Sequence, residues 1–149
     1  MEINFKCTGL EEWAKRIQAL QGLEHDPRLN KELGKGAQIM AGAVKKLTPV
    51  DTGNLRNKIS AINIKSMEWD IETNVEYASY VEFGTGKLGD PTVPHTSKES
   101  WTYYSEKMQR FFTTHGQPPA HMFTKGFSTM RKKVVDIVKV GIRRIVKDA

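Results

Sequence analysis

The chain has 149 residues, of which 38% are hydrophobic and 27% are charged. This length and composition predict one folded domain over residues 1–149 and exclude a disordered chain. No apolar run approaches the ~20 residues that a membrane-spanning helix needs, so we expect no membrane contact. The single cysteine cannot form an internal disulfide bond.

The net charge of +6 is concentrated at the C-terminal end of the chain. Residues 125–149 hold eight Lys and Arg against two Asp, so the first 124 residues are neutral overall. A basic element of this kind indicates an acidic partner or nucleic acid, but it does not predict a fold.

Two helices are predicted in the first third of the chain. Apolar residues recur at helical spacing over residues 10–20, after an N-cap signal at Thr8. Asp26-Pro27 then marks the start of a second helix of about twenty residues, which Pro49 brings to an end. Its apolar positions fall within one arc of a helix, and they are Leu29, Leu33, Ala37, Met40, Val44 and Leu47.

The segment TPVDTGNLR, residues 48–56, follows that helix. Pro49 fixes φ, Asp51 can accept hydrogen bonds from backbone amides just ahead of it, and Gly53 tolerates a left-handed conformation. We therefore predict a rigid corner that leads into a strand beginning near Arg56. The residues expected to form the corner are Pro49, Asp51, Thr52, Gly53 and Leu55.

From residue 56 onward the apolar period changes to two. Residues 58–66 and 69–75 read as an antiparallel hairpin, and residues 100–106 and 108–114 as a second, aromatic-rich one. Between them lie a short turn or helical piece ending in Gly84-Thr85-Gly86 and a polar loop over residues 84–99, expected to be flexible.

The last predicted element is an amphipathic helix over about residues 124–147. One face is apolar and includes Phe127, Val134 and Val138, while charged side chains run down the opposite face. The basic side chains of that face are either solvated or a docking surface, for DNA phosphates or an acidic protein. They are Lys132, Lys139, Arg143 and Lys147.

This order of elements predicts an α+β domain. We expect about four strands in one small antiparallel sheet, packed by the long helix of the N-terminal half and by the C-terminal amphipathic helix.

Asp51-Thr52-Gly53 is also the active-site tripeptide of aspartic proteases. Such an enzyme needs two facing aspartates, which this chain could supply only as a homodimer using Asp51. The flanking sequence argues against that reading, because a long helix precedes the tripeptide where those proteases have an apolar strand.

No other pattern in the sequence points to catalysis. The four histidines and one cysteine do not have the spacing of metal ligands. The glycines at 84 and 86 do not open a helix after a strand, as a phosphate-binding loop would. We therefore predict a protein that is not an enzyme, with no catalytic, cofactor-binding or metal-binding residues and no cofactor.

Three stretches together resemble a known family. TPVDTGNLRNKI, VEYASYVEFGTG and GQPPAHMFTKGF resemble, in this order, the tail-completion or neck proteins of long-tailed bacteriophages and prophages, also described as head–tail joining or minor structural proteins. The resemblance covers about residues 29–147. This chain has Ala120-His121-Met122-Phe123 where the family has Arg-Pro-Phe or similar, which bears on the geometry of that segment.

The resemblance implies a structural virion protein at the neck, assembled in the host bacterial cytoplasm. Its partners would be copies of itself in a ring of six, the head connector or stopper, and the tail-terminator or tail-tube protein, with non-specific contact to the genomic DNA. The loop over 84–99 would be a docking arm. Sheet and loop landmarks would be Tyr77, Tyr80, Glu82, Phe83, Gly84 and Thr85. The alternatives are a small basic nucleic-acid-binding module and, less favoured, the dimeric protease.

Overall fold

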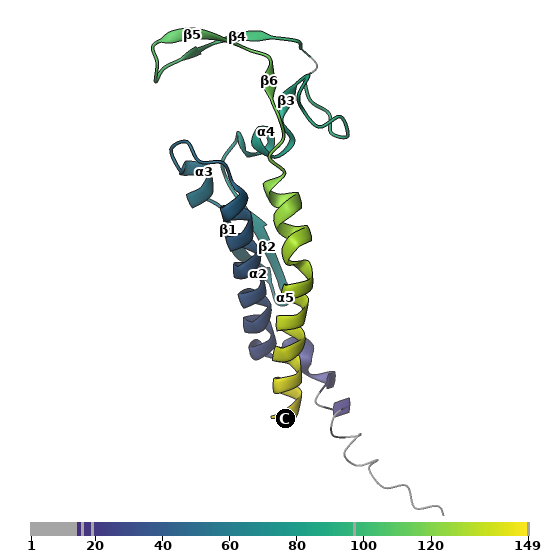
Figure 1. Cartoon of the computed structure of the whole chain (residues 1–149). Helices are drawn as coiled ribbons and strands as arrows, with labels where there is room; N and C mark the ends of the chain where they lie inside the picture. The colour runs from purple at the N-terminus through teal and green to yellow at the C-terminus, as the bar shows by residue number, and fades with distance from the viewer. Residues whose placement is uncertain (1–14, 16, 19, 97, 149) are drawn as a thin grey trace, which may run out of the picture.

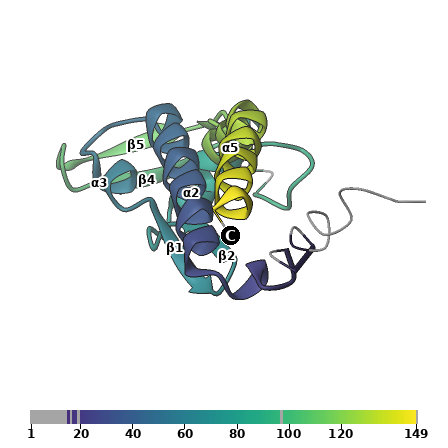
Figure 2. The same ribbon diagram turned by 90° about the horizontal axis from the view of Figure 1, so that it is seen from below.

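A computed structural model describes residues 15, 17–18, 20–96 and 98–148. Two long helices, α2 (Pro27–Leu47) and α5 (Met122–Lys147), lie side by side and run in opposite directions (Figure 1). A hairpin covers one face of this pair (Figure 2), and a second hairpin projects beyond its end. The molecule is therefore an elongated two-layer body with a projecting hairpin.

Helix α2 begins and ends as its sequence predicts. The Asp26 carboxylate accepts a hydrogen bond from the Arg28 backbone amide at 2.8 Å, and Pro27 occupies the first helical position. Hydrogen bonds from the Arg28 side chain and amide also hold the pKa of Asp26 below its ordinary value of 3.8. At the other end Thr48 leaves the helical conformation before Pro49.

The helix predicted over residues 10–20 lies mostly outside the described residues. Residues 15, 17, 18, 20 and 21 are helical, and the 3₁₀ turn η1 (Leu23–His25) then leads into α2.

Glycines allow α2 and α5 to approach closely. A Cβ atom added to Gly126 would lie 2.8 Å from Val44 Cγ2 and 3.2 Å from Val44 Cα. One added to Gly36 would lie 2.9 Å from Val134 Cγ1. Distances of this size are too short for a real side chain, so the two helices pack at these points through backbone and small residues.

The first hairpin pairs β1 (Ser60–Lys65) with β2 (Glu68–Glu72) and packs on α2. Asn30 of α2 holds it in place, because its side-chain oxygen accepts hydrogen bonds from Trp69 Nε1 at 3.0 Å and from the Met67 amide at 3.2 Å. Gly34, one turn further along α2, leaves room for the Trp69 ring.

The strands do not form the single sheet that we expected. In the described residues they form three separate two-stranded antiparallel sheets. These are β1–β2, the second predicted hairpin β4 (Trp101–Ser105) with β5 (Arg110–Thr114), and β3 (Thr85–Gly86) with β6 (Gly116–Gln117). The first hairpin lies along the helix pair and the second projects beyond its end (Figure 1), so their edges do not meet. The α+β class, both hairpins and both long helices are confirmed.

The hydrophobic core lies where α2 ends and α5 begins. Two short helices close it, α3 (Asn54–Asn57) and α4 (Ala78–Phe83). The buried residues of this cluster are Val44, Leu55, Ile59, Val75, Ala78 and Met122. The core therefore sits beside the corner and landmark segments of the sequence.

Candidate functional site

The corner after α2 differs in two ways from its prediction. Gly53 has φ +82° and Leu55 is buried, as a tight turn into the core requires. The chain then enters helix α3, and the strand begins only at Ser60, so the prediction of a strand near Arg56 is wrong. Residues 49–55 line a cavity of about 270 Å³ together with Val81 of α4 and with Tyr77, the residue just before that helix.

Asp51 is not held by backbone amides, which corrects the second prediction. Its side chain is 80% exposed and accepts a hydrogen bond from Lys107 Nζ at 3.1 Å. Thr52 takes the expected role instead, since its hydroxyl accepts from the Asn54 amide at 3.4 Å. An exposed carboxylate paired with a lysine is not poised as one half of an aspartic dyad.

Glu82 of α4 caps the start of α5. Its carboxylate accepts hydrogen bonds from the Phe123 amide at 2.8 Å, the Thr124 amide at 2.9 Å and the Thr124 hydroxyl at 2.7 Å. Only 4% of Glu82 is exposed. The first turn of α5 has no acidic residue and no side-chain cap of its own, so Glu82 supplies both the acceptors and the negative charge that a helix N-terminus favours.

The other landmark residues join α4 to its surroundings. Tyr77 Oη accepts from Asn54 Nδ2 at 3.3 Å, and the Tyr80 carbonyl accepts from Gln117 Nε2 at 2.7 Å. Gly84 has φ +74°, and a Cβ there would lie 2.6 Å from the Gln117 carbonyl oxygen. The Thr85 hydroxyl accepts from the Gln117 amide at 3.2 Å. These residues therefore fix where the chain passes from α4 into β3 and hold β6 beside them.

The loop over residues 84–99 begins with a series of turns. The Asp90 amide donates to the Phe83 carbonyl at 2.7 Å, and the Asp90 carboxylate accepts from the Thr92 hydroxyl at 2.6 Å and the Thr92 amide at 2.9 Å. Between this loop and α4 lies a cavity of about 600 Å³, lined in part by Phe83 and Trp101.

Because of Thr92, the contribution of the Asp90 carboxyl to the stability of the fold depends on pH. Its hydroxyl and amide hydrogen bonds hold the pKa of Asp90 below its ordinary value of 3.8, and His121 and His95 add a smaller attraction. A folded-state pKa below the unfolded value stabilises the fold above pH 3.8, and this stabilisation is lost as the pH falls through the folded-state pKa.

We expect Thr92→Ala to move the pKa of Asp90 upward, toward 3.8. The carboxyl titration can be followed by NMR from about pH 5 to about pH 2, where the linked loss of stability falls. An unchanged Asp90 titration in the variant would show that the hydrogen bond from the Thr92 hydroxyl is not the cause of the lowered pKa.

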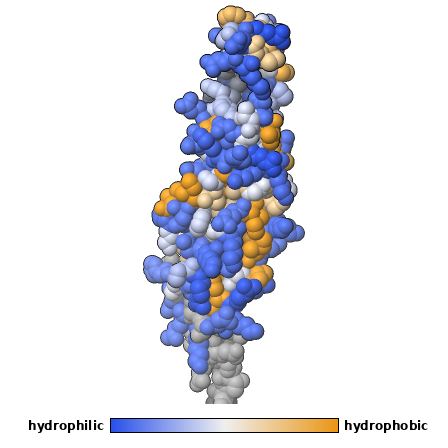
Figure 3. All heavy atoms as spheres, turned by 90° about the vertical axis from the view of Figure 1, so that its left-hand side faces the viewer, coloured by the Kyte–Doolittle hydropathy of each residue, from blue (hydrophilic) through white to orange (hydrophobic). Residues whose placement is uncertain are grey.

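Aromatic side chains are exposed on both faces of the arm, defined here as residues 101–114. Tyr104 and Phe111 form an edge-to-face pair on one face, with ring centroids 5.2 Å apart. Tyr103 and Phe112 stack on the other, where Arg110 lies 4.4 Å from the Phe112 ring centroid. Phe111 is 71% exposed. On the side shown in Figure 3, hydrophobic residues gather at the tip of the molecule and again lower down.

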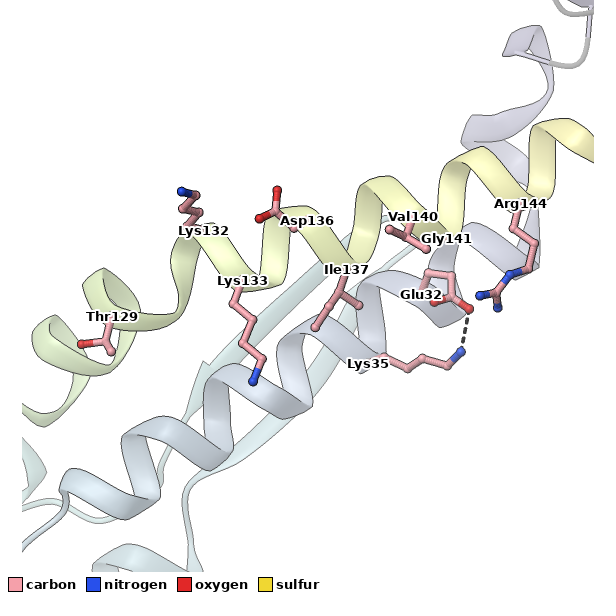
Figure 4. Close-up of a pocket in the computed structure, with 10 residues that line it drawn as sticks. All are labelled: Glu32, Lys35, Thr129, Lys132, Lys133, Asp136, Ile137, Val140, Gly141 and Arg144. Atoms are coloured by element: carbon pink, nitrogen blue, oxygen red, sulfur yellow. Dashed lines mark hydrogen bonds and ion pairs between the residues drawn. The ribbon is translucent and has the colours of Figure 1, made fainter.

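A basic groove runs between α2 and α5 (Figure 4), with a volume of about 690 Å³. Of the predicted basic face of α5 only Lys132 lines it, whereas Lys139, Arg143 and Lys147 do not. We call the ten lining residues the α2–α5 groove. Its charged members are Lys35, Lys132, Lys133 and Arg144 with Glu32 and Asp136, and its apolar floor includes Ile137 and Val140.

Sequence reasoning missed this groove because it treated α5 alone. Lys35 comes from the other helix, and Lys133 and Arg144 lie outside the stripe that the helical period of α5 predicted. The only available signal was the general excess of Lys and Arg near the C-terminus.

Within the described ranges, no cluster of His, Cys, Asp or Glu could hold a metal ion. In the same part of the chain, no helix is long and apolar enough to cross a membrane.

A long helix pair with small hairpins, surface grooves and an exposed arm defines an α+β protein. Residues 11–84 match a family model named HK97-gp10_like, with the description "Bacteriophage HK97-gp10, putative tail-component". This segment, about half of the chain, is similar to the HK97-gp10-like family. No curated protein and no solved structure matches the chain.

The family match confirms the expected kinship with phage tail-completion and neck proteins at the level of a tail component. It supports a structural role in a bacteriophage and a location in the virion.

Proposed function

We propose that this chain is a tail-completion or neck protein that forms a ring, of six copies, between the head connector and the tail. The observation that carries the proposal is the match of residues 11–84 to a phage tail-component family. The arm supports it, because a two-stranded hairpin with aromatic side chains on both faces is marginal alone and gains stability when a partner covers it.

The partners on this proposal are other copies of the chain, the head connector or stopper, and the tail-terminator or tail-tube protein. The arm reaches beyond the helical body (Figure 1), which suits contact with a neighbouring layer of the neck. Basic side chains on α5 suit passage of DNA through the ring or contact with an acidic neighbour.

The test is electron microscopy of particles produced without this protein. We expect filled heads and finished tails that fail to join, and supplying the wild-type chain should restore joined particles. The Asp51→Asn variant should restore them equally well, because the proposal gives Asp51 no catalytic role. Normal infectious particles in the absence of the protein would overturn the proposal. If the wild-type chain restores joined particles but Asp51→Asn does not, that result would favour the dimeric protease.

A further inference from the structure

The α2–α5 groove combines an apolar floor with a basic rim. Val140 is 50% exposed on the floor. On the rim, Lys35 is already paired with Glu32 at 2.6 Å, as Figure 4 shows. In the part of the chain that the structure describes, Lys132, Lys133 and Arg144 form no ion pair. The groove therefore suits a surface that offers both apolar and acidic side chains.

The outer face of the β1–β2 hairpin is such a surface. Trp69 and Ile71 of β2 alternate with three exposed acidic residues. Ile62 on the neighbouring strand β1 lies directly opposite one of these, Asp70. Ile62 and Ile64 are 38% and 50% exposed. We call this surface the acidic face, and it consists of Ile62, Ile64, Glu68, Asp70 and Glu72.

Most of the charge on the acidic face is available to a partner. Glu68 pairs with Lys65 at 2.9 Å. Among the described residues, neither Asp70 nor Glu72 has a cation within ion-pair distance. Two free carboxylates beside two exposed isoleucines complement the free cations and apolar floor of the groove.

The groove and the acidic face lie on opposite sides of the body. Asn30 and Gly34 of α2 contact the hairpin, whereas Glu32 and Lys35 line the groove. At 100° per residue, the two pairs of positions are about 150° apart around α2. In Figure 4 the strands pass behind the helices while the labelled side chains stand in front. One neighbour therefore cannot occupy both surfaces.

We infer that the acidic face of one copy docks into the α2–α5 groove of the next copy. Because the two surfaces differ and lie on opposite sides, the contact is head-to-tail, and it closes into a ring when the rotation between copies fits. The inference rests on the proposed ring and specifies its interface. The second copy is the favoured occupant because the chain itself carries the complementary charge and apolar residues.

The test reverses the charge of each surface in the full-length chain. One variant carries Lys132→Glu and Lys133→Glu, and the other carries Asp70→Lys and Glu72→Lys. All four residues are exposed, and unchanged circular dichroism would confirm that the variants fold. Sedimentation velocity at millimolar concentration should show assembly of the wild-type chain and about tenfold or greater weakening in each variant, because like charges then face each other.

Mixing the two variants in equal amounts should restore assembly, since each groove then meets a hairpin of opposite charge. The matched control is Lys125→Glu with Arg131→Glu, which changes the net charge equally at exposed positions of the same helix but outside the groove. This control should assemble as the wild-type chain does. Assemblies larger than dimers support the head-to-tail contact.

Several outcomes would overturn the inference. They are a wild-type chain that stays monomeric, reversed variants that assemble normally, a mixture that fails to recover, or a control that is equally disrupted. A groove variant that loses binding to duplex DNA but still self-associates would assign the groove to nucleic acid instead. The charge-reversed variants could also form normal rings while particles still require the protein for joining. That result would support the proposed function but contradict this interface.

Discussion

Replacing Glu82 by alanine is expected to lower the free energy of unfolding by about 3 kcal/mol, a large effect for one residue. The carboxylate is buried and accepts three hydrogen bonds at the first turn of α5. Its removal leaves two backbone amides of that turn without their acceptors and opens a space beside the core. Urea denaturation followed by circular dichroism measures the change.

Glu82→Gln separates the shape of the side chain from its charge. The glutamine amide keeps one acceptor oxygen, but its NH₂ group then faces a backbone N–H of α5, and both are donors. We therefore expect Glu82→Gln to lower the free energy of unfolding, but by less than Glu82→Ala does. Glu76→Ala, at an exposed position shortly before α4, is the control and should be nearly neutral. An alanine variant at residue 82 as stable as that control would show that α5 does not depend on this cap.

Replacing Gly126 by alanine is the second change with a large expected effect. The added methyl group would lie 2.8 Å from Val44 Cγ2 and 3.2 Å from the Val44 backbone. Val44 is fully buried and has no room to yield, so the helices must separate. We expect a loss of about 1–3 kcal/mol in the free energy of unfolding, although alanine favours a helix more than glycine does.

Gly42→Ala provides the opposite case on α2. A Cβ atom at Gly42 meets nothing within 4 Å. The helix propensity of alanine should then raise stability by about 0.5–1 kcal/mol. Thermal and urea unfolding of the two variants, measured together, compare the same substitution with and without a packed neighbour. Equal effects at both positions would contradict the close approach at Gly126.

The parts of the fold that the sequence predicts are those with a local, repeating signal. Apolar periodicity and the Asp26-Pro27 start predict α2, and alternating residues predict both hairpins to within three residues at each end. Helix α3 has only four residues, too few for a period, so it was missed. The strands β3 and β6 have only two residues each and were not predicted for the same reason.

The candidate site depends more on contacts between distant segments. Glu82 was identified as a landmark, but its partners lie 41 and 42 residues further along the chain, and no local pattern links them. The groove likewise joins Lys35 to α5 only because the two helices pack antiparallel. Side-chain roles of this kind follow from tertiary packing and cannot be predicted from spacing in the sequence.

The connections of the arm create a mechanical link within the molecule. One strand at its base, β3, follows α4 after Gly84 alone, and the other, β6, is joined to α5 by four residues that include two stiff prolines, Pro118 and Pro119. Glu82 joins the ends of these same two helices. A pull on the arm would therefore reach the cap of α5 by a short path outside the hydrophobic core.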